Sequence, residues 1–205
     1  MEYALTATKN EARAGSYYDR IARFYDLTFK LNGYGRSLDR YFDNHPLPIS
    51  RGARILDAGC GTGLLTLALL RGIRFPVSIT ALDLSSTSIN AARRALYSSR
   101  GRTRDVTFTQ GNLLSLPFAD DSFDFVFLTS VFTHMMPHES AHYLREIGRV
   151  LAPGGRCVST WFLLTDEVNE RHWTDIGDAT TNQVFARGRD VVVVTFVNAE
   201  GDHAE

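Results

Sequence analysis

One segment constrains the fold of this chain more than any other, the glycine-rich run Asp57-Ala58-Gly59-Cys60-Gly61-Thr62-Gly63. It follows an apolar stretch, residues 53–57, that predicts a strand, and it precedes residues 64–71, which predict an apolar helix. A strand that ends in such a turn and opens a helix brings bare backbone close to a ligand at the edge of an open parallel sheet. The segment therefore predicts a Rossmann-like sheet with a ligand site at this turn.

Apolar runs and amphipathic stretches alternate after the turn, as in a series of βαβ units. The pattern predicts strands at 77–82, 106–109, 123–128 and 156–162. It predicts a helix from Ser85 or Ser86 through Leu96 and another from Pro137 to about Leu151, stopped by Pro153-Gly154-Gly155. The central strands are almost continuously apolar, which is typical of a sheet covered by helices on both faces.

The remaining segments complete a single α/β domain. Residues 166–173 predict a short helix, and residues 182–186 and 191–198 predict a closing antiparallel hairpin. We therefore expect a doubly wound, mostly parallel seven-stranded sheet. Residues 46–205 form the ligand-binding domain, and residues 1–45 form a helical cap of the same domain. Within the cap, residues 12–31 combine helical spacing with many aromatic side chains and are expected to lie over the open edge of the site.

Composition narrows the partners. The formal net charge of −1 supplies no field that would attract nucleic acid. Two cysteines, Cys60 and Cys157, cannot build a disulfide framework, and neither has the spacing of a metal ligand. No signal peptide and no apolar run near twenty residues is visible, so we expect a cytoplasmic monomer or homodimer without an integral membrane segment.

The glycine spacing separates classes of nucleotide site. A dinucleotide site requires G-x-G-x-x-G, but here the third glycine, Gly63, comes one residue early and Leu64 stands in its place. The run also lacks the lysine of an ATP-binding P-loop. Asp83 ends the second strand, where a carboxylate can accept hydrogen bonds from both hydroxyls of an adenosine ribose. Taken alone, Asp83 could equally be an acid favoured by the dipole of the helix that follows.

Taken together, these motifs resemble the class I S-adenosylmethionine-dependent methyltransferases, of the type with a ubiquinone/menaquinone methyltransferase-like domain (methyltransferase type 11/25). The resemblance covers about residues 17–162. Besides the loop and Asp83, it is carried by residues 17–22, 25–26, 110–118, 123–127 and 149–155.

The resemblance implies a role for particular residues. The loop would face the methionine part of the cofactor with Asp57 near its amino group, Asp83 would hold the ribose, and Leu84 would pack on adenine. Asn112 stands where the family often has aspartate, and its amide oxygen can still accept a hydrogen bond from the adenine amine. Tyr25 could reach the cofactor carboxylate or could simply pack between cap and core. The cofactor-binding residues implied in this way are Tyr25, Asp57, Ala58, Gly59, Cys60, Gly61, Asp83, Leu84, Asn112, Leu113, Thr129 and Ser130.

Methyl transfer from a sulfonium needs alignment and a dry pocket, and it needs a general base only for a hydroxyl or an acidic carbon. His134 follows the fourth strand and is the best candidate for that base, although a loop histidine bonded to the backbone is an equal alternative. His134, His138 and His142 recur at intervals of four, but Pro137 interrupts the helix and no further ligand has matching spacing. We expect no metal site.

The sequence thus predicts a transferase that moves a methyl group from S-adenosylmethionine to a small molecule, either lipid-like or aromatic. Whether oxygen, nitrogen or carbon is methylated stays open. A quinone acceptor is in doubt, because residues 27–35 lack the pattern that the quinone enzymes carry after their Tyr-Asp pair. The alternatives are an NAD(P)-dependent oxidoreductase and a non-catalytic protein that binds S-adenosylmethionine.

Overall fold

The computed structural model describes residues 34–44, 47–98, 105–129, 131–132, 137–161, 181–187 and 192–197. Its centre is a parallel sheet of five strands in the order β3-β2-β1-β4-β5. Their bounds are β1 Arg54–Ala58, β2 Ser78–Asp83, β3 Val106–Gln110, β4 Phe123–Leu128 and β5 Leu151–Trp161. Strand β7 (Val192–Val197) pairs antiparallel with β5, and β6 (Thr181–Arg187) pairs antiparallel with β7. The order in which the strands are added to the sheet reverses between β1 and β4. Ligands of such open parallel sheets bind at the point where the strand order reverses.

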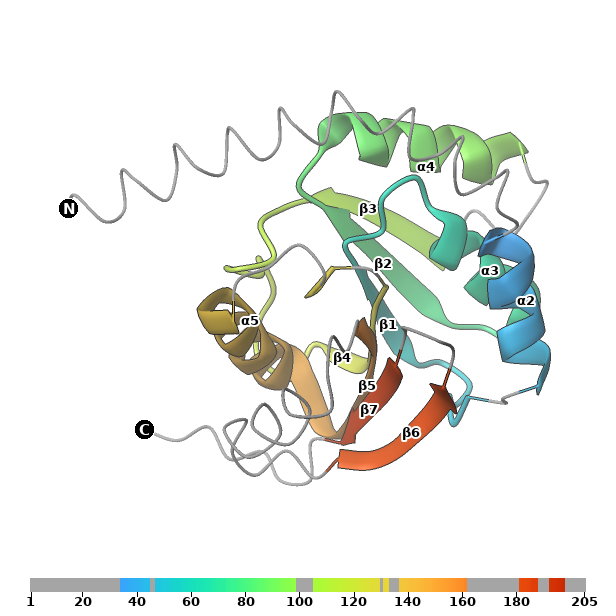
Figure 1. Ribbon diagram of the computed structural model, residues 1–205. Coiled ribbons are helices and arrows are strands. Elements are labelled where there is room, and N and C mark those ends of the chain that lie inside the picture. The colour runs from blue at the N-terminus through green and yellow to red at the C-terminus, as the bar shows by residue number, and fades with distance from the viewer. Residues whose placement is uncertain are drawn as a thin grey trace.

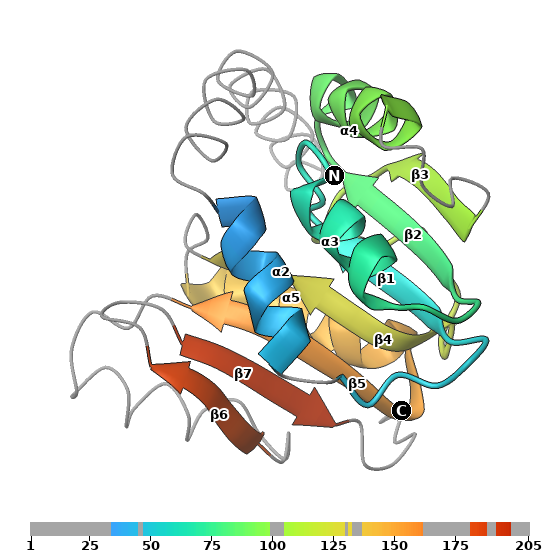
Figure 2. The same cartoon turned by 90° about the vertical axis from the view of Figure 1, so that its right-hand side faces the viewer.

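Helices cover both faces of the sheet (Figures 1 and 2). On one face lie α2 (Tyr34–Asn44) and α3 (Leu64–Gly72), and α5 (Pro137–Val150) lies on the other. Helix α4 (Ser86–Ser98) packs over β2 and β3, where Ile89 meets Ala81. Among the described residues, no helix has both the length and the apolar character needed to cross a bilayer.

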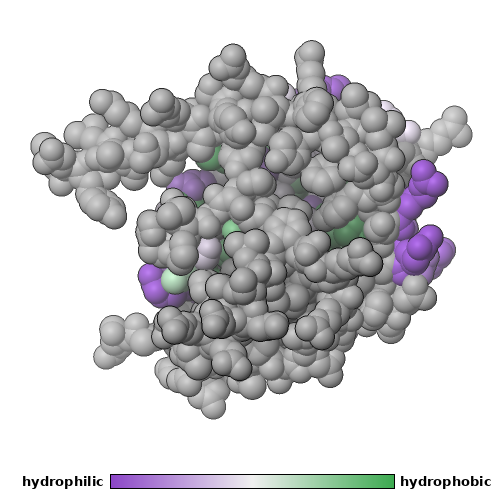
Figure 3. Space-filling model, in the orientation of Figure 1, coloured by the Kyte–Doolittle hydropathy of each residue, from purple (hydrophilic) through white to green (hydrophobic). Residues whose placement is uncertain are grey.

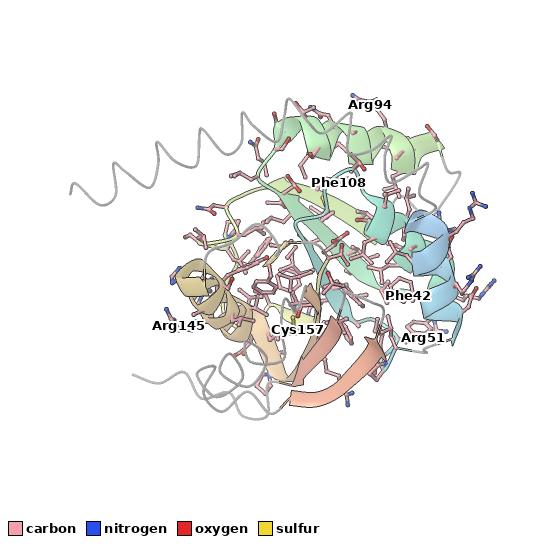
Figure 4. All side chains as sticks on the ribbon, in the orientation of Figure 1. Phe42, Arg51, Arg94, Phe108, Arg145 and Cys157 are labelled. Carbon is pink, nitrogen blue, oxygen red and sulfur yellow. The ribbon has the colours of Figure 1, made fainter. Side chains whose placement is uncertain are left out.

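Alternating side chains of the strands supply the two halves of the core. Ile55 and Phe127 face α2 and α3, whereas Leu56, Val126 and Cys157 belong to the cluster on the α5 side. Figure 4 shows Cys157 inside the molecule. All five side chains are 0–1% exposed, and each fully buried apolar side chain of this size contributes roughly 1.5–3 kcal/mol.

Helix α2 is fastened to the sheet by its inner face. Phe42 points from α2 toward the sheet (Figure 4), and the edge of its ring meets Phe127 with the ring centres 6.1 Å apart. Asp39 accepts hydrogen bonds from Arg71 of α3 at 2.7 and 3.0 Å. Arg36, Arg40 and Asp43 are exposed on α2, and hydrophilic side chains gather at that edge of the molecule (Figure 3). This described part of the predicted cap lies beside α3, whereas residues 1–33 lie outside the described residues.

The five predicted parallel strands are confirmed, and four of them agree with their expected bounds to within a residue. The fifth begins earlier than expected, because Leu151 already pairs with Phe123. Pro153-Gly154-Gly155 therefore forms an irregularity inside β5, with Gly154 at φ +76°, before pairing resumes between Arg156 and Phe125. The predicted helix at 166–173 lies outside the described residues.

Candidate functional site

The glycine-rich loop is tied to the end of the neighbouring strand. The N–H groups of Gly59 and Cys60 both donate to the carbonyl oxygen of Leu82, at 2.8 and 2.9 Å. The Gly61 N–H donates to the Asp83 carboxylate at 2.8 Å. The loop therefore folds back over the carboxyl end of β2.

Each of the three glycines adopts a left-handed conformation, with φ of +79° at Gly59, +52° at Gly61 and +86° at Gly63. A Cβ at Gly63 would lie 2.9 Å from the Cβ of Ala92, so α4 can cross the start of α3 only over a glycine. This close crossing explains why the third glycine comes early. A Cβ at Gly61, in contrast, would meet no described residue within 4 Å, so the backbone there borders open space in the described part of the chain.

Side chains from the segments that follow β3 and β4 pack against Gly59. A Cβ there would lie 2.6 Å from Cγ2 of Val131 and 3.7 Å from Cδ1 of Leu113. The structure thus brings Leu113, a predicted site residue, to the loop, together with Val131, which was not among the predicted site residues. The signal for Val131 is its position just beyond β4, two residues after the half-buried Thr129.

Asp83 is held at the edge where β1 and β2 end. It is half-buried, its Oδ2 accepts the Gly61 N–H, and its Oδ1 accepts the Ser85 N–H at 2.9 Å. Ser85 in turn accepts the Ser88 N–H at 3.0 Å and so caps the start of α4. The carboxylate is fixed in orientation beside the loop.

Asp57 lies at the carboxyl end of β1 and is fully buried. The Thr66 hydroxyl donates to its Oδ2 at 2.5 Å, whereas its Oδ1 is buried without a partner among the described residues. Burial raises the pKa of Asp57 to about 7, hydrogen bonds from Thr66 lower it, and the charge of Asp83 raises it. Thr66 was missed by the sequence analysis, although it is the one polar side chain in the apolar helix segment 64–70.

Other predicted positions lie in the loop, beside it or outside the described residues. The side chains of Ala58 and Cys60, both within the loop, are buried, and burial raises the pKa of the Cys60 thiol. The Leu84 carbonyl accepts a hydrogen bond from Gln110 at 3.1 Å. The Asn112 oxygen accepts the Leu114 N–H at 2.9 Å. Tyr25, Ser130 and His134 lie outside the described residues.

Of the three histidines spaced at intervals of four, His142 alone has a described side chain. His142 places Nε2 at 2.7 Å from the carbonyl oxygen of Leu114. The side chain of His138 lies outside the description, as His134 does. Within the described ranges, no three residues of the metal-ligating types come together.

The arrangement can bind a ligand that carries hydroxyl groups and a cationic amine. Asp83 offers carboxylate oxygens at the edge of the loop, and the buried Asp57 has one oxygen that lacks a hydrogen-bond donor. Two carboxylates flank the loop, and the Asp83 charge already acts on the Asp57 pKa.

Comparisons with known proteins agree with this geometry. Residues 55–155 match the family described as "Methyltransferase domain". The chain is 35% identical over 156 residues to a demethylmenaquinone methyltransferase of Mycobacterium sp. (strain KMS), covering 75% of this chain and 61% of the relative. It is 37% identical over 137 residues to a fatty-acid O-methyltransferase of Mycolicibacterium smegmatis, covering 67% of this chain and 44% of the relative.

A solved structure shares the fold. Magnesium protoporphyrin IX methyltransferase from Synechocystis PCC 6803, solved with bound S-adenosylmethionine, superposes with a TM-score of 0.67 at 15% identity, covering 91% of this chain and 96% of that chain. The chain spans about three fifths of the length of the first curated relatives that it matches. Residues 55–155, about half of the chain, thus match the methyltransferase domain family.

Proposed function

We propose that the protein transfers a methyl group from S-adenosylmethionine to a small-molecule acceptor. The observation that carries this proposal is the loop over β1 and β2, in which the open backbone at Gly61 adjoins Asp83 and the buried Asp57. When bound, S-adenosylmethionine supplies an electrophilic methyl group, so the chain itself needs to provide alignment and exclusion of water.

The described residues fit this cofactor. A nucleoside with an amino-acid tail carries two ribose hydroxyls and one ammonium group. Asp83 would accept the ribose hydroxyls, and the unpartnered oxygen of Asp57 would face the ammonium. Gly61 would bring bare backbone against the tail, since a side chain there would occupy the open space. Leu84, Leu113 and Thr129 would line the adenine and the far wall.

The acceptor is the less defined half of the reaction. The matched relatives are named as a demethylmenaquinone methyltransferase, a ubiquinone/menaquinone biosynthesis C-methyltransferase and a fatty-acid O-methyltransferase. We propose a lipid-like or aromatic acceptor. His134 stays our candidate for the base that a hydroxyl or acidic carbon would require.

We further propose that residues 46–205 work as one domain. The pairing of β7 with β5 and of β6 with β7 supports a complete seven-stranded sheet closed by the hairpin. Residues 1–45 would cap the same domain, and the packing of α2 on α3 supports this for residues 34–44. The protein would act in the cytoplasm.

Calorimetric titration tests the cofactor. We expect S-adenosylmethionine and S-adenosylhomocysteine to bind in the micromolar range that is ordinary for metabolite sites, and NAD to give no heat. A signal with NAD and none with the two sulfur ligands would establish the oxidoreductase alternative instead.

A methyl-release assay tests catalysis. The protein is incubated with S-adenosylmethionine carrying a labelled methyl group and with a panel of a naphthoquinol, fatty acids and small phenols. We expect label in one of these classes. Binding of the cofactor without transfer to any acceptor would favour the alternative of a non-catalytic binding protein.

A further inference from the structure

A buried hydroxyl–carboxylate pair lies beneath the glycine-rich loop. Thr66 and Asp57 are 1% and 0% exposed, and the Thr66 hydroxyl donates to Oδ2 of Asp57. Thr66 projects from the first turn of α3, where it can reach the end of β1. Because this bond engages Oδ2, the other oxygen of the carboxylate is left as the orphan.

Among the described residues, the surroundings of this pair hold no compensating cation. The pKa of Asp57 is shifted by burial, by hydrogen bonds from Thr66 and by the charge of the Asp83 carboxylate across the loop on β2. Neither Thr66 nor Asp83 carries a positive charge. The neighbouring titratable groups are the buried Cys60 thiol in the loop and the buried Tyr143 phenol on α5, both of which feel the Asp57 charge. Burial without a neighbouring cation favours the protonated, uncharged form of a carboxyl group.

We propose that Thr66 is a positioning residue that directs the second oxygen of Asp57 to the cationic amine of the bound cofactor, and that a proton leaves Asp57 for solvent as the amine arrives. The inference rests on the proposed function, because it takes the ligand to be S-adenosylmethionine or its product. Binding is then linked to pH: the amine pairs with the carboxylate form only, so acid weakens binding by keeping Asp57 protonated.

The unmodified protein provides the first test. S-adenosylhomocysteine is titrated into it between pH 5.5 and pH 8.5, with 5′-methylthioadenosine, which lacks the amino-acid part, as the matched ligand. We expect the affinity for S-adenosylhomocysteine to be about tenfold lower at pH 6 than at pH 8, because Asp57 titrates near pH 7. The affinity for 5′-methylthioadenosine should change by less than about twofold over the same range.

Proton release is a second readout that needs no variant. Calorimetry at pH 7 in two buffers of different ionisation enthalpy should show about half a proton released for each S-adenosylhomocysteine bound, and none for 5′-methylthioadenosine. Equal pH profiles for the two ligands, with no proton released, would overturn the inference.

Variants then assign the effect to the pair. Asp57→Asn should bind S-adenosylhomocysteine weakly and with no pH dependence. Thr66→Val removes the hydrogen bond that favours the charged carboxylate, so the pH at which affinity falls should rise by about one unit. Thr66→Ser, which keeps the hydroxyl, should restore the original midpoint. If Thr66→Val instead weakened both ligands equally at every pH, Thr66 would have a structural role only.

The two proposals fail in different ways. Absence of binding by both ligands would contradict the proposed function itself. Binding of both ligands without a difference in pH dependence would leave the cofactor assignment standing and would refute the role of Thr66 and Asp57 in proton release.

Discussion

At the scale of single residues, the site is built around two carboxylates in different environments. Asp83 accepts hydrogen bonds from two backbone N–H groups at the edge of the loop, whereas Asp57 is buried beneath the loop and accepts a hydrogen bond from the Thr66 hydroxyl. The first carboxylate is oriented for a ligand by the backbone itself. The second is destabilised in the free protein, and its burial makes sense if a ligand supplies what it lacks.

The burial of Asp57 predicts a pH dependence of folding. Its folded-state pKa, about 7, lies above the ordinary value, so this group contributes most to stability in acid and loses that contribution as the pH rises from about 4 through 7. Asp57→Asn does not titrate, so the variant should gain stability relative to the unmodified protein by up to about 1.4 kcal/mol per pH unit across this window. Urea unfolding of both ligand-free proteins at pH 5 and pH 8 measures the difference, and an unchanged difference would contradict the raised pKa.

Asp83 should be needed for both the loop and the ligand. Asp83→Ala leaves the Gly61 and Ser85 N–H groups without their acceptor, and we expect a stability loss of about 1–3 kcal/mol together with at least a tenfold weaker binding of S-adenosylhomocysteine. Ser85→Ala is the matched control, since it removes the cap on Ser88, leaves the Asp83 carboxylate in place and should cost about 1 kcal/mol of stability. An equal loss of affinity in both variants would show that Asp83 acts through folding alone.

At the scale of secondary-structure elements, Gly63 at the crossing of α3 and α4 has a different role from Gly61. Gly63→Ala should destabilise the fold by about 2–4 kcal/mol, because a methyl group must fit against Ala92 at a positive φ. Gly61→Ala should cost only about 1 kcal/mol, yet it should weaken cofactor binding strongly by filling the open space. Thermal unfolding and calorimetric titration of the two variants check both expectations. Reversed effects would show that the ligand does not lie beside Gly61.

Helix α5 holds the segment before β4 through one arginine. The Arg149 guanidinium donates to the carbonyl oxygens of Leu116 and Phe118 and pairs with Glu146 and Asp120. The hydrogen bond from Arg149 lowers the pKa of Glu146, so its contribution to stability is present at neutral pH and is lost as the pH falls through the lowered pKa.

Arg149→Met should therefore lower the free energy of unfolding by about 2–3 kcal/mol at pH 7 and by less near pH 3. Arg145→Met is the control, because Arg145 lies exposed on the outside of the same helix (Figure 4), and its effect should stay within about 0.5 kcal/mol. Denaturant titration at both pH values distinguishes the two variants.

The same elements show how far local pattern reaches. Strands and helices of the sheet were predictable because burial on both faces leaves near-continuous apolar runs between turn residues. The start of β5 was not, because the pairing of Leu151 with Phe123 depends on another strand. Within the site, the glycine loop and Asp83 were visible as local motifs. The contacts of Thr66 with Asp57, of Val131 with Gly59 and of Ala92 with Gly63 join different elements, and no spacing rule predicts them.

At the scale of the whole molecule, the two cysteines lie on opposite sides of the sheet. Cys60 packs with Ala81 and Ile89 near α4, and Cys157 belongs to the cluster beneath α5. Burial raises the pKa of both thiols, so both are protonated at neutral pH and neither reacts while the fold is closed.

The two thiols can therefore report opening of the loop and opening of the core separately. Alkylation of Cys60 requires only that the loop lift from β2, whereas alkylation of Cys157 requires that the core come apart. Pulse labelling followed by mass spectrometry should therefore modify Cys60 faster than Cys157, and S-adenosylhomocysteine should slow the labelling of Cys60 more strongly. Equal rates at the two thiols would mean that loop and core open in one cooperative step.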